Sequence, residues 1–291
     1  MRYLFTLTVI LCASLRLAAQ EGSDATIFHI FSSHAAFPDT GRAKGHIYDN
    51  KLYSAAEHYQ DSTVLIIAPK NFHTAKKADI IFWFHGWRNN VDNAAARYEL
   101  TKQFILSKRN AVLVLAETAR DAPDSYGGKL ENAGVFKALV ADVLIGLKAK
   151  GIIKPNCRVG NILLAGHSGA YRVMAGIIKK GSEPIDEIIL FDALYAETDI
   201  FTAWIKADPA HRFINLFTDH GGTLDETHAM TKLLDDADVN YLKLEEKDAL
   251  PAQYRSQRIL FIHSLQQHDD IVNPDNFRIM LENSPFLKRV K

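Results

Sequence analysis

The chain has 291 residues, and its 34 lysines and arginines balance its 34 aspartates and glutamates, so its formal net charge is zero. With no excess of positive charge and no basic stripe, the composition argues against nucleic acid or an anionic membrane surface as a partner. Of the two cysteines, Cys12 lies in the N-terminal apolar run, and if that run is removed as a leader only Cys157 remains and no internal disulfide can form. A hydrophobic core then has to stabilise the fold, and a chain of this length can bury one.

The N-terminal residues are typical of a secretory signal peptide. Arg2 supplies a positive charge, an apolar run extends from Tyr3 to Leu15, and Ala19 offers a small residue for cleavage. The run is shorter than the roughly 20 apolar residues that span a bilayer. We therefore expect residues 1–19 to be a signal peptide and residues 20–291 to form one exported domain, periplasmic or secreted, with no disulfide and no integral membrane segment.

Short apolar runs recur along the chain and are typical of strands buried in a sheet. They lie at 26–31, 63–68, 79–84, 111–116, 162–165, 188–191, 213–217 and 259–262. Helical patterns alternate with them, and the clearest covers 135–147 and is closed by Gly151. This alternation predicts an α/β fold with a mostly parallel central sheet and helices on both faces. Ligands of such sheets bind at the carboxyl ends of the strands.

One of these apolar runs ends in a serine flanked by glycines. Gly166, Ser168 and Gly169 form most of a G-x-S-x-G pattern, with Ala170 at its last position, and a helical pattern follows that stops at Gly181. A buried strand that turns sharply into a helix lifts the serine hydroxyl above the sheet, and the flanking small residues avoid collisions with neighbouring elements. The stretch therefore predicts a nucleophile elbow with Ser168 as the nucleophile.

A serine nucleophile needs a base to take its proton. The polar loop after the last predicted strand contains His268, which is our candidate for the base. His263 lies inside the strand pattern, where a packed or hydrogen-bonded histidine is expected instead.

Two aspartates compete for the role of the acid that orients this base. Asp192 and Asp219 each follow a predicted strand and lie between Ser168 and His268 in the chain. We favour Asp192, because it leaves the strand that comes directly after the elbow unit. Asp219 precedes two glycines and could instead cap a turn.

The reaction also needs donors for the oxyanion of a tetrahedral intermediate. The backbone N–H of Gly169 is one candidate, since it follows the nucleophile. The second is the N–H of Trp87 in the loop 84–90, where Gly86 permits a tight turn. The loop 117–131 falls on the same side of the predicted sheet and is long enough to help shape a pocket.

Motifs for metals and nucleotide cofactors do not occur in the sequence. The 12 histidines form no His-Glu-x-x-His pattern, and no Gly-x-Gly-x-x-Gly or Gly-x-x-x-x-Gly-Lys follows a strand. We expect the protein to use neither a metal nor another cofactor.

These residues together resemble the α/β-hydrolase superfamily, from about Thr63 to the C-terminus. The chain is similar in particular to bacterial exported hydrolases that carry Gly-His-Ser-Gly-Ala-Tyr-Arg, here at 166–172, and a late His-Asp-Asp, here at 268–270. The resemblance implies a serine hydrolase that acts on a small or polymer-linked acyl substrate. We favour a carboxylic ester as the substrate, because an alkoxide leaves more easily than an amine; an amidase, a peptidase and a non-catalytic binding protein of the same fold are the alternatives.

Overall fold

The computed structural model describes residues 24–74 and 76–290. The predicted signal peptide, residues 1–19, lies outside the described residues and therefore stays a prediction. Within the described part, no helix has both the length and the apolar composition needed to cross a membrane.

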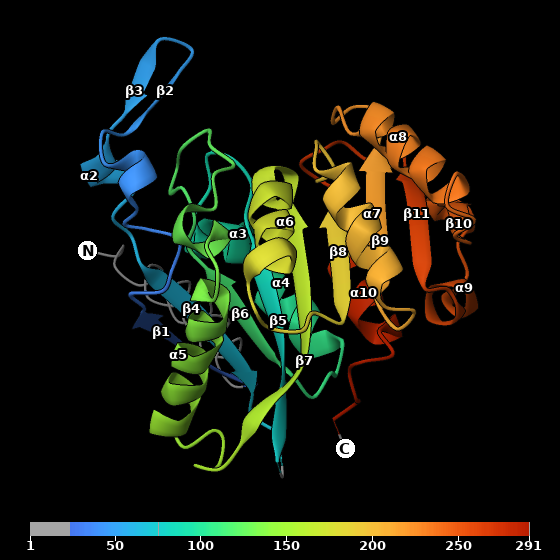
Figure 1. The fold of residues 1–291 in the computed structure, drawn as a ribbon. Helices are drawn as coiled ribbons and strands as arrows, with labels where there is room; N and C mark the ends of the chain where they lie inside the picture. The colour runs from blue at the N-terminus through green and yellow to red at the C-terminus, as the bar shows by residue number, and fades with distance from the viewer. Residues whose placement is uncertain (1–23, 75, 291) are drawn as a thin grey trace, which may run out of the picture.

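A nine-stranded sheet runs through the centre of the described chain (Figure 1). Its strands, in spatial order, are β1 (Ala25–Phe31), β4 (Thr63–Pro69), β6 (Val112–Ala116), β5 (Lys77–Phe84), β7 (Arg158–His167), β8 (Glu187–Phe191), β9 (Arg212–Thr218), β11 (Ile259–Ser264) and β10 (Leu242–Glu245). β4 is antiparallel to both β1 and β6, and the other neighbouring pairs are parallel. The predicted α/β fold class is thus confirmed, and the strand ends differ from the prediction by only a few residues.

Helices cover both faces of this sheet (Figure 1). One face carries α5 (Val135–Ala149), α6 (Tyr171–Lys180), α7 (Thr198–Ala207) and α8 (Leu224–Asp235), and the other carries α3 (Val91–Arg97), α4 (Leu100–Leu106), α9 (Pro251–Ser256) and α10 (Asn276–Asn283). The side chains of a strand alternate between the two faces, so Phe82 belongs to one apolar cluster and Trp83 to the other. The sheet is therefore buried on both sides, which explains its continuous apolar runs.

Two small features were not predicted from the sequence. β2 (His46–Tyr48) and β3 (Lys51–Tyr53) form an antiparallel hairpin that projects beyond the sheet, next to α2 (Ala55–His58) (Figure 1). Its turn residues Asp49 and Asn50 both have positive φ, of 48° and 58°, as two-residue hairpin turns require. β10 is the second unpredicted element, and it extends one edge of the sheet.

Short 3₁₀ helices join several of these elements. They are η1 (Thr40–Arg42), η2 (Gly128–Glu131), η3 (Ser168–Ala170) and η4 (Glu246–Asp248).

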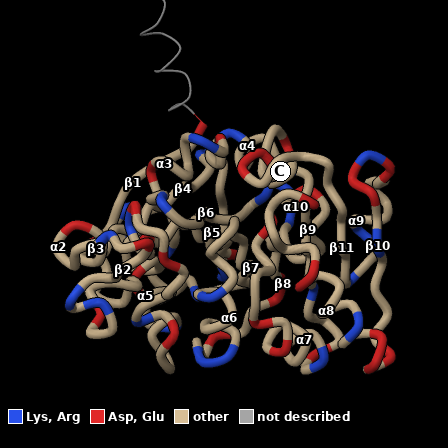
Figure 2. Tube along the Cα trace, turned by 90° about the horizontal axis from the view of Figure 1, so that it is seen from above, with Lys and Arg blue, Asp and Glu red and all other residues tan. Residues whose placement is uncertain are grey.

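Seen from above, Lys and Arg are interspersed with Asp and Glu over the described chain (Figure 2). The balanced composition is therefore also a balanced spatial distribution.

Candidate active site

Ser168 lies at the sharp turn between β7 and α6, where the sequence predicts it. Its φ is 56°, in the left-handed region that side chains with a Cβ avoid, and it begins the 3₁₀ turn η3 that leads into α6. Such a conformation costs on the order of 1–3 kcal/mol and persists only where the surrounding structure holds it. The backbone therefore has the geometry of a nucleophile elbow.

Close approaches around Ser168 explain why small residues surround it. A Cβ on Gly166 would lie 2.5 Å from the Cβ of Ala170, and one on Gly86 would lie 2.6 Å from the Cβ of Ser168. A Cβ on Gly169 would lie 2.6 Å from Cδ1 of the Trp87 indole. Real Cβ atoms do not come this close to other atoms, so the strand, the loop after β5 and the turn pack together only because these positions are glycine.

His268 makes its closest side-chain contact with Asp192. The Nδ1 of His268 lies 2.6 Å from Oδ2 of Asp192, which is completely buried just after β8, while the imidazole remains partly exposed. Since an ionised carboxylate only accepts hydrogen bonds, Nδ1 carries the proton and donates it. This fixes the tautomer that leaves the other ring nitrogen, Nε2, as an acceptor.

The carboxylate of Asp192 is held by donors from the loop after β9. The hydroxyl of Thr223 and the backbone N–H of Thr218, at 3.3 Å, both donate to Oδ1. A Cβ on Gly221 would overlap the carboxylate, so this loop can close over Asp192 only because the residue is glycine. The Tyr195 hydroxyl donates to the Gly221 carbonyl and keeps the loop in place.

The structure places Asp219 away from His268, in contact with His263. Oδ1 of Asp219 lies 3.1 Å from Nε2 of His263, and Glu245 lies 2.9 Å from the Nδ1 of the same ring. His263 is in β11 and is partly exposed, so the expectation of a hydrogen-bonded histidine within a strand agrees with the structure. The two candidate acids thus contact different histidines, and only Asp192 contacts His268.

A buried ion pair orients the loop that follows β5. His85 is buried, and its Nε2 lies 2.5 Å from Oε1 of Glu117, while its Nδ1 donates to the Gly86 carbonyl at 2.7 Å. Burial lowers the pKa of His85, but the charge and hydrogen bond of Glu117 and the bond to the Gly86 carbonyl outweigh it, and the net pKa is raised. Both ring nitrogens of His85 thus have hydrogen-bond partners, which fix the orientation of the ring.

The His85 ring also sets the direction of the Trp87 N–H. The Gly86 carbonyl and the Trp87 N–H belong to one planar trans peptide and point in opposite directions. Because His85 binds the carbonyl, the N–H points away from His85, and it has no hydrogen-bond partner among the described residues. The Trp87 indole N–H donates to the Ser125 hydroxyl at 2.7 Å, which links this loop to the loop 117–131.

His167, next to Ser168, is a buried and neutral histidine. Its Nε2 donates to the His268 carbonyl at 2.9 Å, so its Nδ1 is the acceptor for the Tyr98 hydroxyl at 3.1 Å. Burial, with a smaller effect from His268, lowers the pKa of His167 to about 4. The bond to the carbonyl ties the loop that carries His268 to the end of β7.

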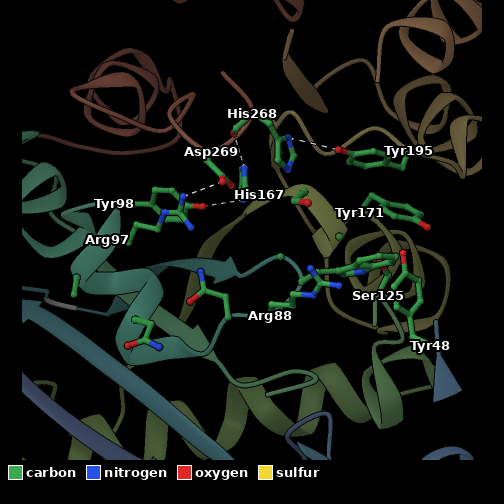
Figure 3. A pocket seen from close by; sticks show the side chains of 17 residues that line it. Tyr48, Arg88, Arg97, Tyr98, Ser125, His167, Tyr171, Tyr195, His268 and Asp269 are labelled. Carbon is green, nitrogen blue, oxygen red and sulfur yellow. Dashed lines mark hydrogen bonds and ion pairs between the residues drawn. The ribbon is translucent and has the colours of Figure 1, made fainter. Parts of the chain in front are cut away.

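Ser168 and His268 line one pocket of about 890 Å³ at the carboxyl ends of the strands (Figure 3). Gly169 and Trp87 line it as well, so the predicted nucleophile, base and oxyanion donors meet there, with Asp192 behind the base. The pocket also contains Ser125, which shows that the loop 117–131 contributes to its wall, as the sequence suggests.

One cluster of side chains in this pocket has the composition of a metal site. Ligand atoms of His167, His268 and Asp269 lie within 4.8 Å of one another. Both ring nitrogens of His167 are already engaged, one by Tyr98 and the other by the His268 carbonyl. A metal at this position would have to break the bond that ties the His268 loop to β7, so the donor set fits a metal poorly.

Several residues of the site were missed in the sequence. Thr223, Tyr195 and Tyr98 act through contacts between segments far apart in the chain, and no local pattern marks them. Glu117 had a usable signal, because it is an acidic residue directly at the end of a buried strand and faces the His85 that ends the neighbouring strand.

We expect the close contact of Gly166 with Ala170 to make position 166 intolerant of any side chain. Gly166→Ala should lower the free energy of unfolding by about 1–3 kcal/mol, because the added methyl overpacks the elbow. Ala170→Gly in the same chain removes the nearest atom and should restore part of that loss. Urea unfolding of both single variants and the double variant measures this. An unchanged midpoint for Gly166→Ala would contradict the packing.

We expect His167 to destabilise the protein at acidic pH. The folded ring stays neutral down to about pH 4, whereas the unfolded ring takes up a proton near pH 6.5, so stability falls as pH decreases between these values, by about 3 kcal/mol in all. His167→Gln should lose this part of the pH dependence, while the exposed-site control His228→Gln should keep it. Urea unfolding at pH 7 and pH 4.5 provides the comparison, and an equal drop in wild type and His167→Gln would refute the expectation.

Comparison with known proteins gives similarity in structure alone. No protein-family model matches the chain, and no curated protein matches it in sequence. A ferulic acid esterase resembles it with a TM-score of 0.53 and 11% identity, over 89% of this chain and 98% of the other.

Two further solved structures resemble the chain to the same degree. The fluorophosphonate-binding serine hydrolase F of Staphylococcus aureus has a TM-score of 0.52 and 11% identity, over 90% of this chain and 100% of the other. Carboxyl esterase 2 of the fungus Tuber melanosporum has a TM-score of 0.52 and 11% identity, over 92% and 88%. With its sheet order and its elbow after β7, the chain has the fold of the α/β-hydrolase superfamily.

Proposed function

We propose that the protein is a serine hydrolase that cleaves carboxylic esters through an acyl-enzyme. The observation that carries this proposal is the hydrogen bond from His268 to the buried Asp192, beside a serine held at a φ of 56° in the same pocket. A buried carboxylate, an oriented imidazole and a strained serine are the parts of a Ser-His-Asp triad.

In the proposed first step, Nε2 of His268 takes the hydroxyl proton of Ser168, and the serine oxygen attacks the ester carbonyl carbon. The imidazolium that forms is stabilised by Asp192, whose Oδ2 accepts the Nδ1 proton. Thr223 and Thr218 donate to the other carboxylate oxygen, which holds the carboxylate in the orientation that faces His268.

The oxyanion of the tetrahedral intermediate is proposed to bind the N–H groups of Gly169 and Trp87. The ion pair of His85 with Glu117 supports this role for Trp87, because it fixes the peptide that carries the N–H before substrate arrives. Donors that are already oriented need no reorganisation as charge develops, and each such donor contributes roughly 10²–10³ to kcat.

The intermediate then collapses and expels the alkoxide, which takes the proton from the His268 imidazolium. Water then attacks the acyl group on Ser168, with His268 as the base, and the carboxylic acid leaves. No step requires a cofactor. The esterases among the structures of similar fold support ester substrates, and the easier departure of an alkoxide supports the same preference over amides.

We expect a fluorophosphonate probe to label the wild-type protein covalently and Ser168→Ala not at all. Mass spectrometry of the intact protein gives the added mass, and the exposed-serine variant Ser182→Ala should be labelled like the wild type. Absence of labelling in well-folded wild type would favour a non-catalytic binding protein. A nitrophenyl ester and the nitroanilide of the same acyl group then separate an esterase from an amidase.

We expect Asp192→Asn to lower kcat by up to about four orders of magnitude with KM little changed, because asparagine favours the wrong tautomer of His268. Asp219→Asn is the matched control and should cost far less, since Asp219 contacts His263. Circular dichroism of each variant excludes unfolding as the cause. The reverse ranking of the two variants would assign the acid to Asp219, and a loss below about tenfold in both would rule out a triad with either.

A further inference from the structure

Three residues that line the active-site pocket carry a formal charge: Arg88, Arg97 and Asp269. Arg97 and Asp269 neutralise each other, with an N–O distance of 3.0 Å. The side chain of Arg88 has no hydrogen bond or ion pair with any described residue, and Figure 3 shows it among the pocket residues with no dashed line to a partner. Among the described charged side chains that line the pocket, Arg88 is therefore the one without an ion-pair partner.

The backbone of Arg88 is held in a conformation that an arginine rarely adopts. Its φ is 54°, in the left-handed region where glycine and asparagine are favoured. Two hydrogen bonds to the neighbouring segment fix it, from the Arg88 N–H to the Ala122 carbonyl at 2.9 Å and from the Asp121 N–H to the Asn89 carbonyl at 2.8 Å. These bonds hold the backbone so that the side chain of Arg88 lies at the pocket beside Trp87.

We propose that Arg88 binds a carboxylate on the substrate, so that the site selects esters that carry a negative charge away from the scissile bond. A guanidinium presents paired N–H donors that match a carboxylate, and the Arg88 guanidinium has no partner among the described residues that would compete for them. This inference rests on the proposed ester hydrolysis at Ser168. It adds the substrate class, because the body of the substrate would lie between Ser168 and Arg88 in one pocket.

The test compares esters that differ only in charge. The 4-nitrophenyl monoesters of glutaric, adipic and suberic acid carry a free carboxylate on the acyl side, and their methyl-capped counterparts do not. A second pair, 4-acetoxybenzoate and its methyl ester, carries the charge on the leaving group. We expect kcat/KM to be about tenfold or more higher for the charged member of at least one pair, as for a hydrogen bond to a charged group. The pair of esters that shows the preference tells whether Arg88 binds the acyl side or the leaving group of the substrate.

Variants at position 88 separate this role from a structural one. Arg88→Gln should bring the ratio of charged to neutral kcat/KM close to one, and Arg88→Lys should keep part of it, since lysine retains the charge without the planar fork. Arg88→Gly suits the left-handed backbone, so its melting temperature should stay near the wild-type value while the ratio is lost. The matched control is Lys108→Gln, an exposed cation with a φ of 54° outside the pocket, which should leave both rates unchanged.

Ionic strength gives an independent readout. Added salt screens a partly exposed charge pair, so the wild-type ratio should fall as salt rises while that of Arg88→Gln should not change. A wild-type ratio near one in every pair, or a ratio that persists in Arg88→Gln, overturns the inference while leaving the esterase proposal intact. If no ester of either charge is hydrolysed and no fluorophosphonate labelling occurs, the proposed function itself fails, and the role of Arg88 falls with it.

Discussion

The hydrogen bond between His268 and Asp192 joins segments that lie 76 residues apart and determines how the carboxyl edge of the sheet is arranged. Asp192 can be buried there only because Thr223 and Thr218 donate to its carboxylate and because Gly221 has no side chain to displace it. An unpaired buried carboxylate would be strongly destabilising, so each of these contacts is needed for the acid to lie behind the imidazole. The same bond leaves Nε2 of His268 unprotonated, so the fold sets the chemistry of the ring.

A second buried pair, His85 with Glu117, fixes the loop that carries Trp87. His85 and Glu117 end neighbouring strands, β5 and β6, and their ion pair is removed from solvent. If one partner left such a buried pair, the other would be buried without compensation, at a high cost in free energy. The pair is therefore a rigid support for the loop after β5. Through the Gly86 carbonyl, this support fixes the peptide plane of Trp87. Two histidines thus have different roles, since His85 is a buried anchor while His268 has to change its protonation in the proposed reaction.

Local sequence patterns predict much of this architecture, and the rest depends on contacts between segments far apart in the chain. The strands were predictable because a sheet covered on both faces needs continuous apolar runs, and the elbow was predictable because close packing needs Gly166 and Gly169. β2, β3 and β10 were missed because they have only three or four residues and partly exposed side chains, which leaves little periodicity to detect. The sequence favoured Asp192 over Asp219, and the sheet order gives the physical reason why the two differ, since β11 lies beside β9 and brings Asp219 to His263 instead of His268.

Three of the residues with positive φ lie at the carboxyl edge of the sheet. Arg88, Ser168 and Asp192 follow the neighbouring strands β5, β7 and β8, and all three have positive φ, of 54°, 56° and 44°. At on the order of 1–3 kcal/mol each, the three conformations together cost a sizeable part of the net stability of a typical domain. A fold stabilised by a large two-sided core can carry that cost, provided that hydrogen bonds over-determine each position, as the bonds to Arg88 N–H and the Asp192 carboxylate do. Because these three conformations lie at the carboxyl edge of the sheet, the protein gives up stability for the placement of Ser168, Asp192 and Arg88, the residues to which we assign the proposed reaction and substrate binding.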